Sequence, residues 1–104
     1  MTMLETSQAD EQTFAGSVRL VHAVGMHARP AVKLTKLAKK FQAQVSVRVA
    51  DAPEWINAKS VAKIMAMRAA HGSTIEIKAS GSDAEAAVAA LVDLIATDFP
   101  DGNS

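Results

Sequence analysis

The chain has 104 residues, of which 49% are hydrophobic and 21% charged, and it contains no cysteine. This length is typical of one domain, since domains commonly span about 100–200 residues. The lack of cysteine excludes disulfides, thiolate zinc sites, iron–sulfur clusters and cysteine nucleophiles. No apolar run approaches the ~20 residues needed to span a bilayer, and the first ten residues lack the features of a signal peptide. We therefore expect a cytoplasmic protein with no membrane insertion.

The formal net charge is zero, but the charges are unevenly distributed. Nine of the eleven basic residues lie between residues 29 and 68, where only two acidic residues oppose them, so this stretch has a net charge of +7. Both ends of the chain are acidic. A basic region of this kind favours a negatively charged partner, whether phosphate, nucleic acid or an acidic protein surface, and charge alone does not choose among them.

The first elements are marked by a change in periodicity. Residues 1–12 are polar and acidic without periodicity, and they are typical of a disordered leader. From Phe14 to Leu20 apolar and polar residues alternate, which predicts a half-buried strand. Gly25 then predicts a turn, and apolar residues at spacings of three and four predict an amphipathic helix over 28–40.

The remaining elements follow the same two periodicities. The pattern predicts a strand over 45–49, a turn over 51–54, a short strand at 55–56, a helix after Ser60 that ends near Gly72, a strand over 74–79 and a final helix over 84–99. The order is β-α-β-β-α-β-α. Because the strands alternate cleanly, we expect an α+β open-faced β-sandwich, with a four-stranded antiparallel sheet covered on one face by three helices. The expected domain spans 13–99 and is followed by a flexible tail at 100–104.

The most informative stretch is GMHARPA, residues 25–31. A strand ends, a glycine allows a turn, and a helix begins at or just after His27. Pro30 fits the first helical turn, where a missing N–H is tolerated. The free N–H groups of that turn, on Ala28 and Arg29, form an anion site together with the helix dipole. The guanidinium of Arg29 can hold a phosphate through two parallel hydrogen bonds.

An imidazole beside an anion site can carry a phosphoryl group. Its reference pKa of about 6.5 leaves a neutral, nucleophilic fraction at cellular pH. The sequence has no glycine-rich nucleotide loop and no carboxylate pair placed for magnesium, so such a histidine must receive its phosphoryl group from another protein. No metal or cofactor is expected, because His22, His27 and His71 lack the spacing of zinc ligands. Taken alone, a histidine at a helix start is more often a cap or a surface residue.

The string GMHARPA resembles the active-site motif of the histidine-containing phosphocarrier protein (HPr) family of the bacterial phosphoenolpyruvate-dependent sugar phosphotransferase system. A second string, NAKSVAKIM at 57–65, is similar to the regulatory-serine region of that family. The resemblance covers about residues 13–99. It implies that His27 is phosphorylated through Nδ1, that Arg29 pairs with the phosphoryl group, and that the protein is a substrate of transferases, without enzymatic turnover of its own.

The resemblance also implies a set of partners. They are enzyme I, a IIA protein or domain, and an HPr kinase/phosphorylase acting on Ser60; we expect a monomer. Ser60 is explained equally well as a plain helix N-cap. Two departures from the family pattern concern docking: Ala62 replaces a bulky apolar residue, and Arg68 replaces a common glycine. The residues expected at the docking surface are Met26, Val61, Ala62, Lys63 and Met65.

Two other functions remain open. One is a phosphocarrier paralogue that serves a nitrogen-regulatory or dihydroxyacetone-linked branch, since His27 and Ser60 do not distinguish it from a sugar-uptake carrier. The other is a nucleic-acid-binding α/β module that uses the basic middle of the chain. Against it stand the few aromatic residues available for stacking, three Phe and one Trp, and a pI near 6.8. We therefore expect no nucleic-acid partner.

Overall fold

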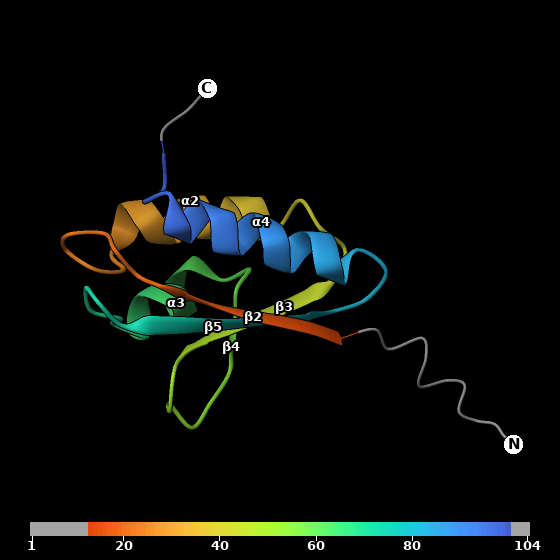
Figure 1. Cartoon of the computed structure of the whole chain (residues 1–104), viewed down its shortest axis with the longest axis horizontal. Helices are drawn as coiled ribbons and strands as arrows, with labels where there is room; N and C mark the ends of the chain where they lie inside the picture. The colour runs from red at the N-terminus through yellow and green to blue at the C-terminus, as the bar shows by residue number, and fades with distance from the viewer. Residues whose placement is uncertain (1–12, 101–104) are drawn as a thin grey trace, which may run out of the picture.

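The computed structural model describes residues 13–100, which form four strands and three helices (Figure 1). They are β2 (Thr13–Arg19), α2 (Ala28–Ala38), β3 (Gln44–Val49), β4 (Ile56–Asn57), α3 (Val61–Ala66), β5 (Thr74–Ser80) and α4 (Ala84–Ala96). The predicted order β-α-β-β-α-β-α is confirmed. The leader expected over 1–12 and residues 101–104 of the expected tail lie outside the described residues.

The strands form one antiparallel sheet in the order β2-β5-β3-β4. In the centre of the sheet, Ile77 of β5 lies opposite Gly16 of β2 on one side and Val47 of β3 on the other. Val47 in turn pairs with Ile56 of β4. This register puts the apolar residues of neighbouring strands on the same face, which is what the period of two predicted.

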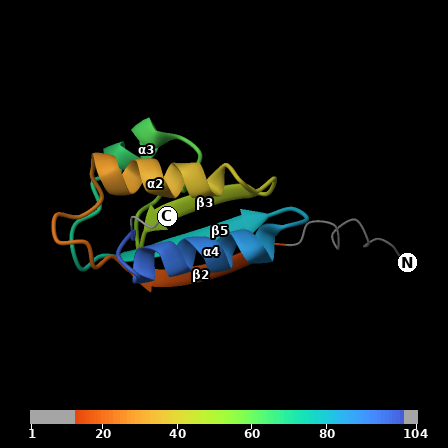
Figure 2. The ribbon, with the colours of Figure 1, turned by 90° about the horizontal axis from the view of Figure 1, so that it is seen from above.

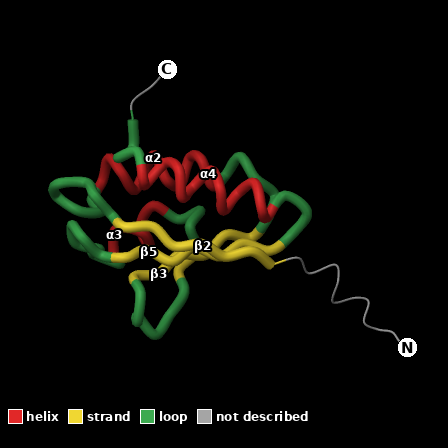
Figure 3. The backbone as a smooth tube through the Cα atoms, viewed as in Figure 1, coloured by secondary structure: helices red, strands yellow, loops and turns green. Residues whose placement is uncertain are grey.

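The three helices lie on that apolar face. Helices α2 and α4 run side by side over the sheet, and α3 lies beside α2 (Figures 1 and 2). The helical and strand layers are seen separately in Figure 3. The sheet and each of the two long helices contribute fully buried side chains to one core, among them Ile75, Ile77, Leu34, Leu91 and Ile95. The predicted open-faced α+β sandwich is therefore confirmed.

Helix α4 packs very closely on β2 because one strand position has no side chain. A Cβ at Gly16 would lie 3.0 Å from Cγ1 of Val88 and 3.3 Å from Cγ2 of Val92. Interiors are packed without spare volume, so a methyl group here would push the helix away from the sheet.

Three helix ends differ from the prediction. Helix α4 ends at Ala96, before the expected end at Phe99, because Asp98 and Phe99 have φ values of +62° and +51° and leave the helical region. Helix α2 ends at Ala38, before the expected end at Lys40, because the N–H groups of Lys40 and Phe41 bond to carbonyls three residues back and close a tighter turn. Helix α3 ends at Ala66, because Arg68 has a φ of +52° and leaves the helical region. Gly72, with a φ of +89°, belongs to a later turn and is not the cap of α3.

The open face of the sheet is polar. Strand β4 begins at Ile56, one residue later than expected, and Trp55 precedes it in the loop from β3. The Trp55 ring lies 4.5 Å from the Arg48 guanidinium and 4.4 Å from the Lys78 ammonium. These cation–π contacts hold the loop against the uncovered face of β3 and β5.

Candidate functional site

The loop between β2 and α2 is tied to the segment that precedes β5. The N–H of Leu20 donates to the carbonyl of Ser73, and the N–H of Gly72 donates to the carbonyl of Leu20, both at 2.8 Å. Further along, the N–H of Met26 donates to the carbonyl of Ala69 at 2.9 Å. These bonds fix both ends of the loop, so the start of α2 has a defined position.

Gly25 allows this loop to turn tightly just before the helix. Its φ is +78°, and its N–H closes a turn onto the carbonyl of His22 at 3.0 Å. A Cβ at this position would lie 2.6 Å from the carbonyl oxygen of Ala69. Both the backbone conformation and the available space therefore require glycine here.

His27 is the N-cap residue of α2. Its backbone is extended, with φ −122° and ψ −160°, and its carbonyl accepts the first helical hydrogen bond from Ala31 at 2.9 Å. Its ring makes no capping hydrogen bond and is exposed. The imidazole is therefore available for chemistry and is not used to satisfy the helix end.

The first turn of α2 offers backbone donors beside this imidazole. Ala28 and Arg29 are exposed, and their N–H groups have no acceptor among residues 13–100. Pro30, which has no N–H, occupies the next position and is buried. Two free N–H groups and a guanidinium at the positive end of a helix dipole are the groups that the predicted anion site requires.

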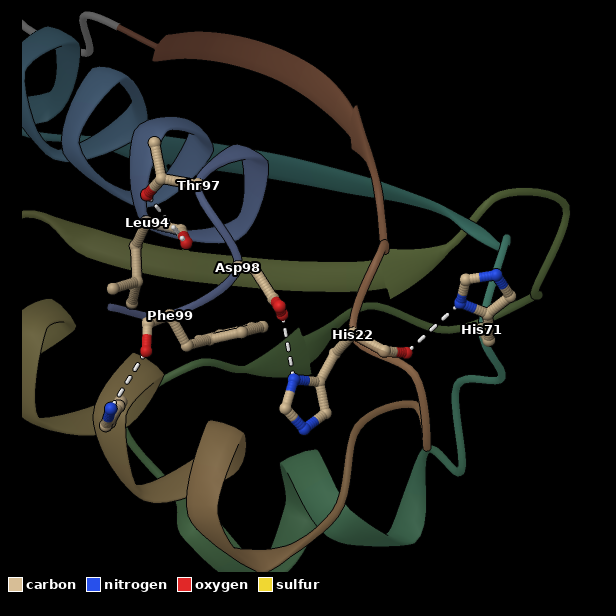
Figure 4. A network of polar contacts seen from close by, with 7 residues as sticks. His22, His71, Leu94, Thr97, Asp98 and Phe99 are labelled. Atoms are coloured by element: carbon tan, nitrogen blue, oxygen red, sulfur yellow. Dashed lines mark hydrogen bonds and ion pairs between the residues drawn. The ribbon is translucent and has the colours of Figure 1, made fainter. Parts of the chain in front are cut away.

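A second histidine lies beside the first. The ring centroids of His22 and His27 are 5.4 Å apart, and the rings are tilted by 35°. Nδ1 of His22 lies 2.8 Å from Oδ1 of Asp98, just after α4, and the Phe99 ring stands edge-on to His22 at 5.9 Å between centroids (Figure 4). His71 contacts the same loop through its Nδ1, 3.2 Å from the carbonyl of His22.

The sequence did not reveal the partnership of His22 with Asp98. The two residues are 76 positions apart and belong to different loops. The only sequence signal was that a second histidine, His22, lies close to the motif. The periodicity of the sequence carries no information about which loops meet. A second contact that the sequence did not reveal joins α2 to the segment after α4, where Nζ of Lys33 donates to the carbonyl of Phe99 at 2.8 Å.

Four of the five residues expected at the docking surface have exposed area. Ala62 and Lys63 are exposed, Met65 is 39% exposed and Val61 is half-buried, all on α3. Met26 does not fit the expectation: it is only 4% exposed, because its side chain anchors the loop in the core and leaves little surface for a partner.

Exposed valines near the motif were not anticipated. Val24 is 68% exposed in the loop before His27, and Val32 is 41% exposed on α2. Apolar side chains exposed beside an anion site offer contact area to a partner protein.

Ser60 is the N-cap of α3. Its side-chain oxygen accepts a hydrogen bond from the N–H of Lys63 at 3.2 Å, as a cap residue does. The residue is half-buried. The capping role is thus directly observed, and it leaves the hydroxyl partly accessible.

Two further findings concern the described part of the chain. Residues 13–100 contain no group of three or more His, Asp or Glu side chains arranged to hold a metal ion. Within the same range, no helix combines the length and the apolar character needed to cross a membrane.

Fold and site together define a class of protein. It is an open-faced α+β sandwich in which the N-cap residue of one helix presents an exposed imidazole that makes no capping hydrogen bond. A family model described as "PTS HPr component phosphorylation site" matches residues 15–97. The phosphocarrier protein HPr of Haloferax volcanii is 37% identical over 81 residues, which cover 78% of this chain and 91% of that protein. The phosphocarrier protein NPr of Escherichia coli is 37% identical over 87 residues, covering 84% and 96%.

Solved structures agree with these relatives. An HPr structure from Thermoanaerobacter tengcongensis superposes with a TM-score of 0.77 at 33% identity, over 86% of this chain and 99% of that one. An HPr from Bacillus anthracis gives a TM-score of 0.74 at 32% identity, over 80% and 96%. The chain therefore belongs to the HPr family, the phosphocarrier proteins of the phosphotransferase system.

Proposed function

We propose that this protein accepts a phosphoryl group on His27 from enzyme I of the sugar phosphotransferase system and passes it to a IIA protein or domain. One observation carries the proposal: the His27 ring is exposed and makes no capping bond, beside the free N–H groups of Ala28 and Arg29. The protein acts as a substrate of its partners in the cytoplasm, as a monomer.

The transfer step requires only the residues at the tip of α2. The lone pair of neutral His27 Nδ1 attacks the phosphorus of the phosphohistidine on enzyme I. A new N–P bond forms while the old one breaks, and the electron pair of the broken bond stays on the leaving imidazole nitrogen. The N–H groups of Ala28 and Arg29, with the guanidinium, stabilise charge on the transferring group, as donors fixed before the reaction do.

Incubation with phosphoenolpyruvate and enzyme I tests the proposal. We expect an acid-labile, base-stable phosphohistidine on the wild-type chain and none on His27→Ala. His71→Ala is the matched control, because it removes an exposed histidine outside the tip of α2, and it should still be labelled. Equal labelling of wild type and His27→Ala, or no labelling of either, contradicts the proposal.

A second candidate role keeps the chemistry and changes the branch. The relative named phosphocarrier protein NPr is as similar in identity as the relatives named HPr, at 37% over 87 residues, and so favours a nitrogen-regulatory paralogue as the alternative. Enzyme I of the sugar branch and its counterpart of the nitrogen branch, compared at equal concentration, separate the two. Faster labelling of His27 by the nitrogen-branch enzyme would overturn the sugar-branch proposal.

Ser60 is proposed as the regulatory position. A half-buried hydroxyl at the N-cap of α3 supports this, because the same helix carries the exposed Ala62, Lys63 and Met65. Phosphorylation would add about −1.5 to −2 charges beside these residues and so oppose an acidic partner. Incubation with ATP and HPr kinase/phosphorylase should label the wild type but not Ser60→Ala, and labelling of both would contradict the assignment.

A further inference from the structure

His22 and Asp98 form a pair that the transfer step described above does not use. Nδ1 of His22 lies 2.8 Å from Oδ1 of Asp98, and the two side chains are 25% and 52% exposed. A carboxylate can only accept a hydrogen bond, so the proton of this bond is on Nδ1 of His22. The second nitrogen, Nε2, points away from Asp98 (Figure 4) and has no hydrogen-bond partner among residues 13–100.

The ring of His22 is close to the reactive ring of His27. The centroids of His22 and His27 are 5.4 Å apart with a tilt of 35°. Ring centroids 4.5–7 Å apart correspond to direct contact between rings. A group carried on a ring nitrogen of His27 therefore comes within reach of a donor on the ring of His22.

The backbone after α4 holds Asp98 in place at a conformational cost. Asp98 and Phe99 have φ values of +62° and +51°, a region that is unfavourable for residues with a Cβ. Several contacts hold this segment: the Phe99 ring is 4% exposed, its N–H donates to the carbonyl of Leu94 and its carbonyl accepts from Lys33, both at 2.8 Å. Strain of this kind persists only where surrounding contacts impose it, and it is concentrated at functional sites.

The charges around His22 favour an arriving anion. A phosphoryl group brings close to two negative charges. Among the described residues, Asp98 provides the only carboxylate that pairs with the His22 ring. The titratable and charged groups on the elements around His22 are Asp98 after α4 with Glu85 and Asp93 on that helix, His27 at the N-cap of α2 with Arg29, Lys33 and Lys36 on that helix, and His71 before β5.

We propose that His22 binds the phosphoryl group carried by His27, donating a hydrogen bond from its Nε2–H, and that Asp98 is the positioning residue that keeps Nδ1–H directed toward itself. When the phosphoryl group arrives, His22 takes up a proton from the solvent at Nε2, so that both ring nitrogens carry a hydrogen. No bond to phosphorus forms on His22. The inference rests on the proposed phosphorylation of His27.

The equilibrium of phosphoryl exchange between enzyme I and the full chain tests this role. His22→Ala should lower the equilibrium constant about tenfold, as expected for loss of a hydrogen bond to a charged group; this is about 1.4 kcal/mol. His22→Gln keeps a side-chain N–H donor and should lose less than about threefold. Asp98→Asn should lower the constant in the wild type but not in the His22→Ala background, because the two residues act as one unit.

A spectroscopic measurement on the wild-type chain does not depend on any variant folding. In 15N NMR, phosphorylation of His27 should shift the Nε2 resonance of His22, while Nδ1 keeps its proton. In the unphosphorylated Asp98→Asn variant, the ring of His22 should no longer keep its proton on Nδ1 alone. A merely structural contact would leave the Nε2 resonance unchanged.

His71→Gln is the matched control, because the ring of His71 contacts only the main-chain carbonyl of His22 and not its ring. It should change the equilibrium constant less than about twofold. An unchanged constant in a folded His22→Ala variant, or an Nε2 resonance that does not respond to phosphorylation, overturns the role of His22. Absence of label on His27 in the wild type would instead overturn the proposed function, so the two failures are distinguishable.

Discussion

At the scale of single residues, the site depends on side chains that make no hydrogen bond or ion pair with the rest of the described chain. His27 is an N-cap residue whose ring does not cap, and Arg29 is exposed with no side-chain partner among the described residues. Groups left free in this way at a helix tip are ready to bind an anion without first breaking an internal contact. This is the physical difference between His27 and a capping residue such as Ser60, which accepts from Lys63.

Arg29 should affect the rate of transfer far more than stability. Because a guanidinium holds phosphate through two hydrogen bonds, Arg29→Ala should lower kcat/KM for transfer from enzyme I by about tenfold or more. Arg29→Lys keeps the charge but not the paired geometry and should be intermediate. Lys36→Ala is the control, since Lys36 is an exposed cation on the last turn of the same helix. Equal rates in all variants would contradict phosphate binding by Arg29.

The sequence identified the residues of the helix tip but not their neighbours. His27 and Arg29 stand within one motif, so their spacing alone puts them together. The contact of His22 with Asp98 joins two loops 76 positions apart, and the burial of Met26 depends on a bond to Ala69. Such contacts depend on how loops pack, which local periodicity does not encode.

At the scale of elements, the position of α2 depends on the loop that leads to it. The turn at Gly25 and the bond from Met26 to Ala69 place the first residue of the helix tip. The sequence predicted the helices and strands well, because each buries one face and its apolar residues therefore recur at a regular spacing. It misplaced the end of α3, because a left-handed Arg68 is invisible to periodicity and glycine is the usual residue in that conformation.

Gly25→Ala should damage both stability and transfer. The new Cβ would meet the Ala69 carbonyl at 2.6 Å in a left-handed conformation, so we expect a loss of about 2 kcal/mol or more. Gly72→Ala is a matched control: its φ is also positive, at +89°, but its Cβ would meet nothing closer than 3.8 Å. It should lose about 1 kcal/mol. Denaturant unfolding measures the difference, and equal losses would contradict a specific contact with Ala69.

The N-cap of α3 allows capping and charge to be separated at Ser60. Ser60→Ala removes the acceptor for the Lys63 N–H and should cost about 1 kcal/mol, or about 4–8 °C in Tm. Ser60→Asp keeps a good cap but adds a negative charge, so it should retain Tm and slow transfer to His27. Thermal unfolding and transfer rates measured on both variants check this. Slow transfer in Ser60→Ala alone would mean that the cap, not the charge, affects the partner.

At the scale of the whole molecule, the sheet brings segments from both ends of the described chain to one edge of the site. The strand order β2-β5-β3-β4 places the loop after β2 beside the segment before β5, and α4 returns Asp98 and Phe99 to the tip of α2. The site thus needs the complete fold. Local unfolding of either α4 or the β2–α2 loop should release His22 from Asp98.

At the end of the sandwich opposite His27, one carboxylate connects the start of α4 to the turn after α2. Oδ2 and Oδ1 of Asp83, just before α4, accept hydrogen bonds from the N–H groups of Gln42 and Ala43 at 2.9 and 2.8 Å. The bond from Gln42 contributes most to lowering the pKa of Asp83 below its ordinary value of 3.8, and the bond from Ala43 adds to it, while partial burial opposes both. Asp83 therefore connects the turn after α2 to the start of α4.

This lowered pKa predicts how stability changes with pH. A carboxyl group whose pKa is lower in the folded state stabilises the fold fully above its unfolded pKa, and the contribution is lost as pH falls through the folded value. Asp83→Asn should therefore lower Tm at pH 7, and its deficit relative to wild type should shrink below pH 3.8. Asp93→Asn, at an exposed position on the same helix, should not change Tm at either pH. A deficit for Asp83→Asn that stays constant into the acid range would show that the side chain acts through its shape, and not through its charge.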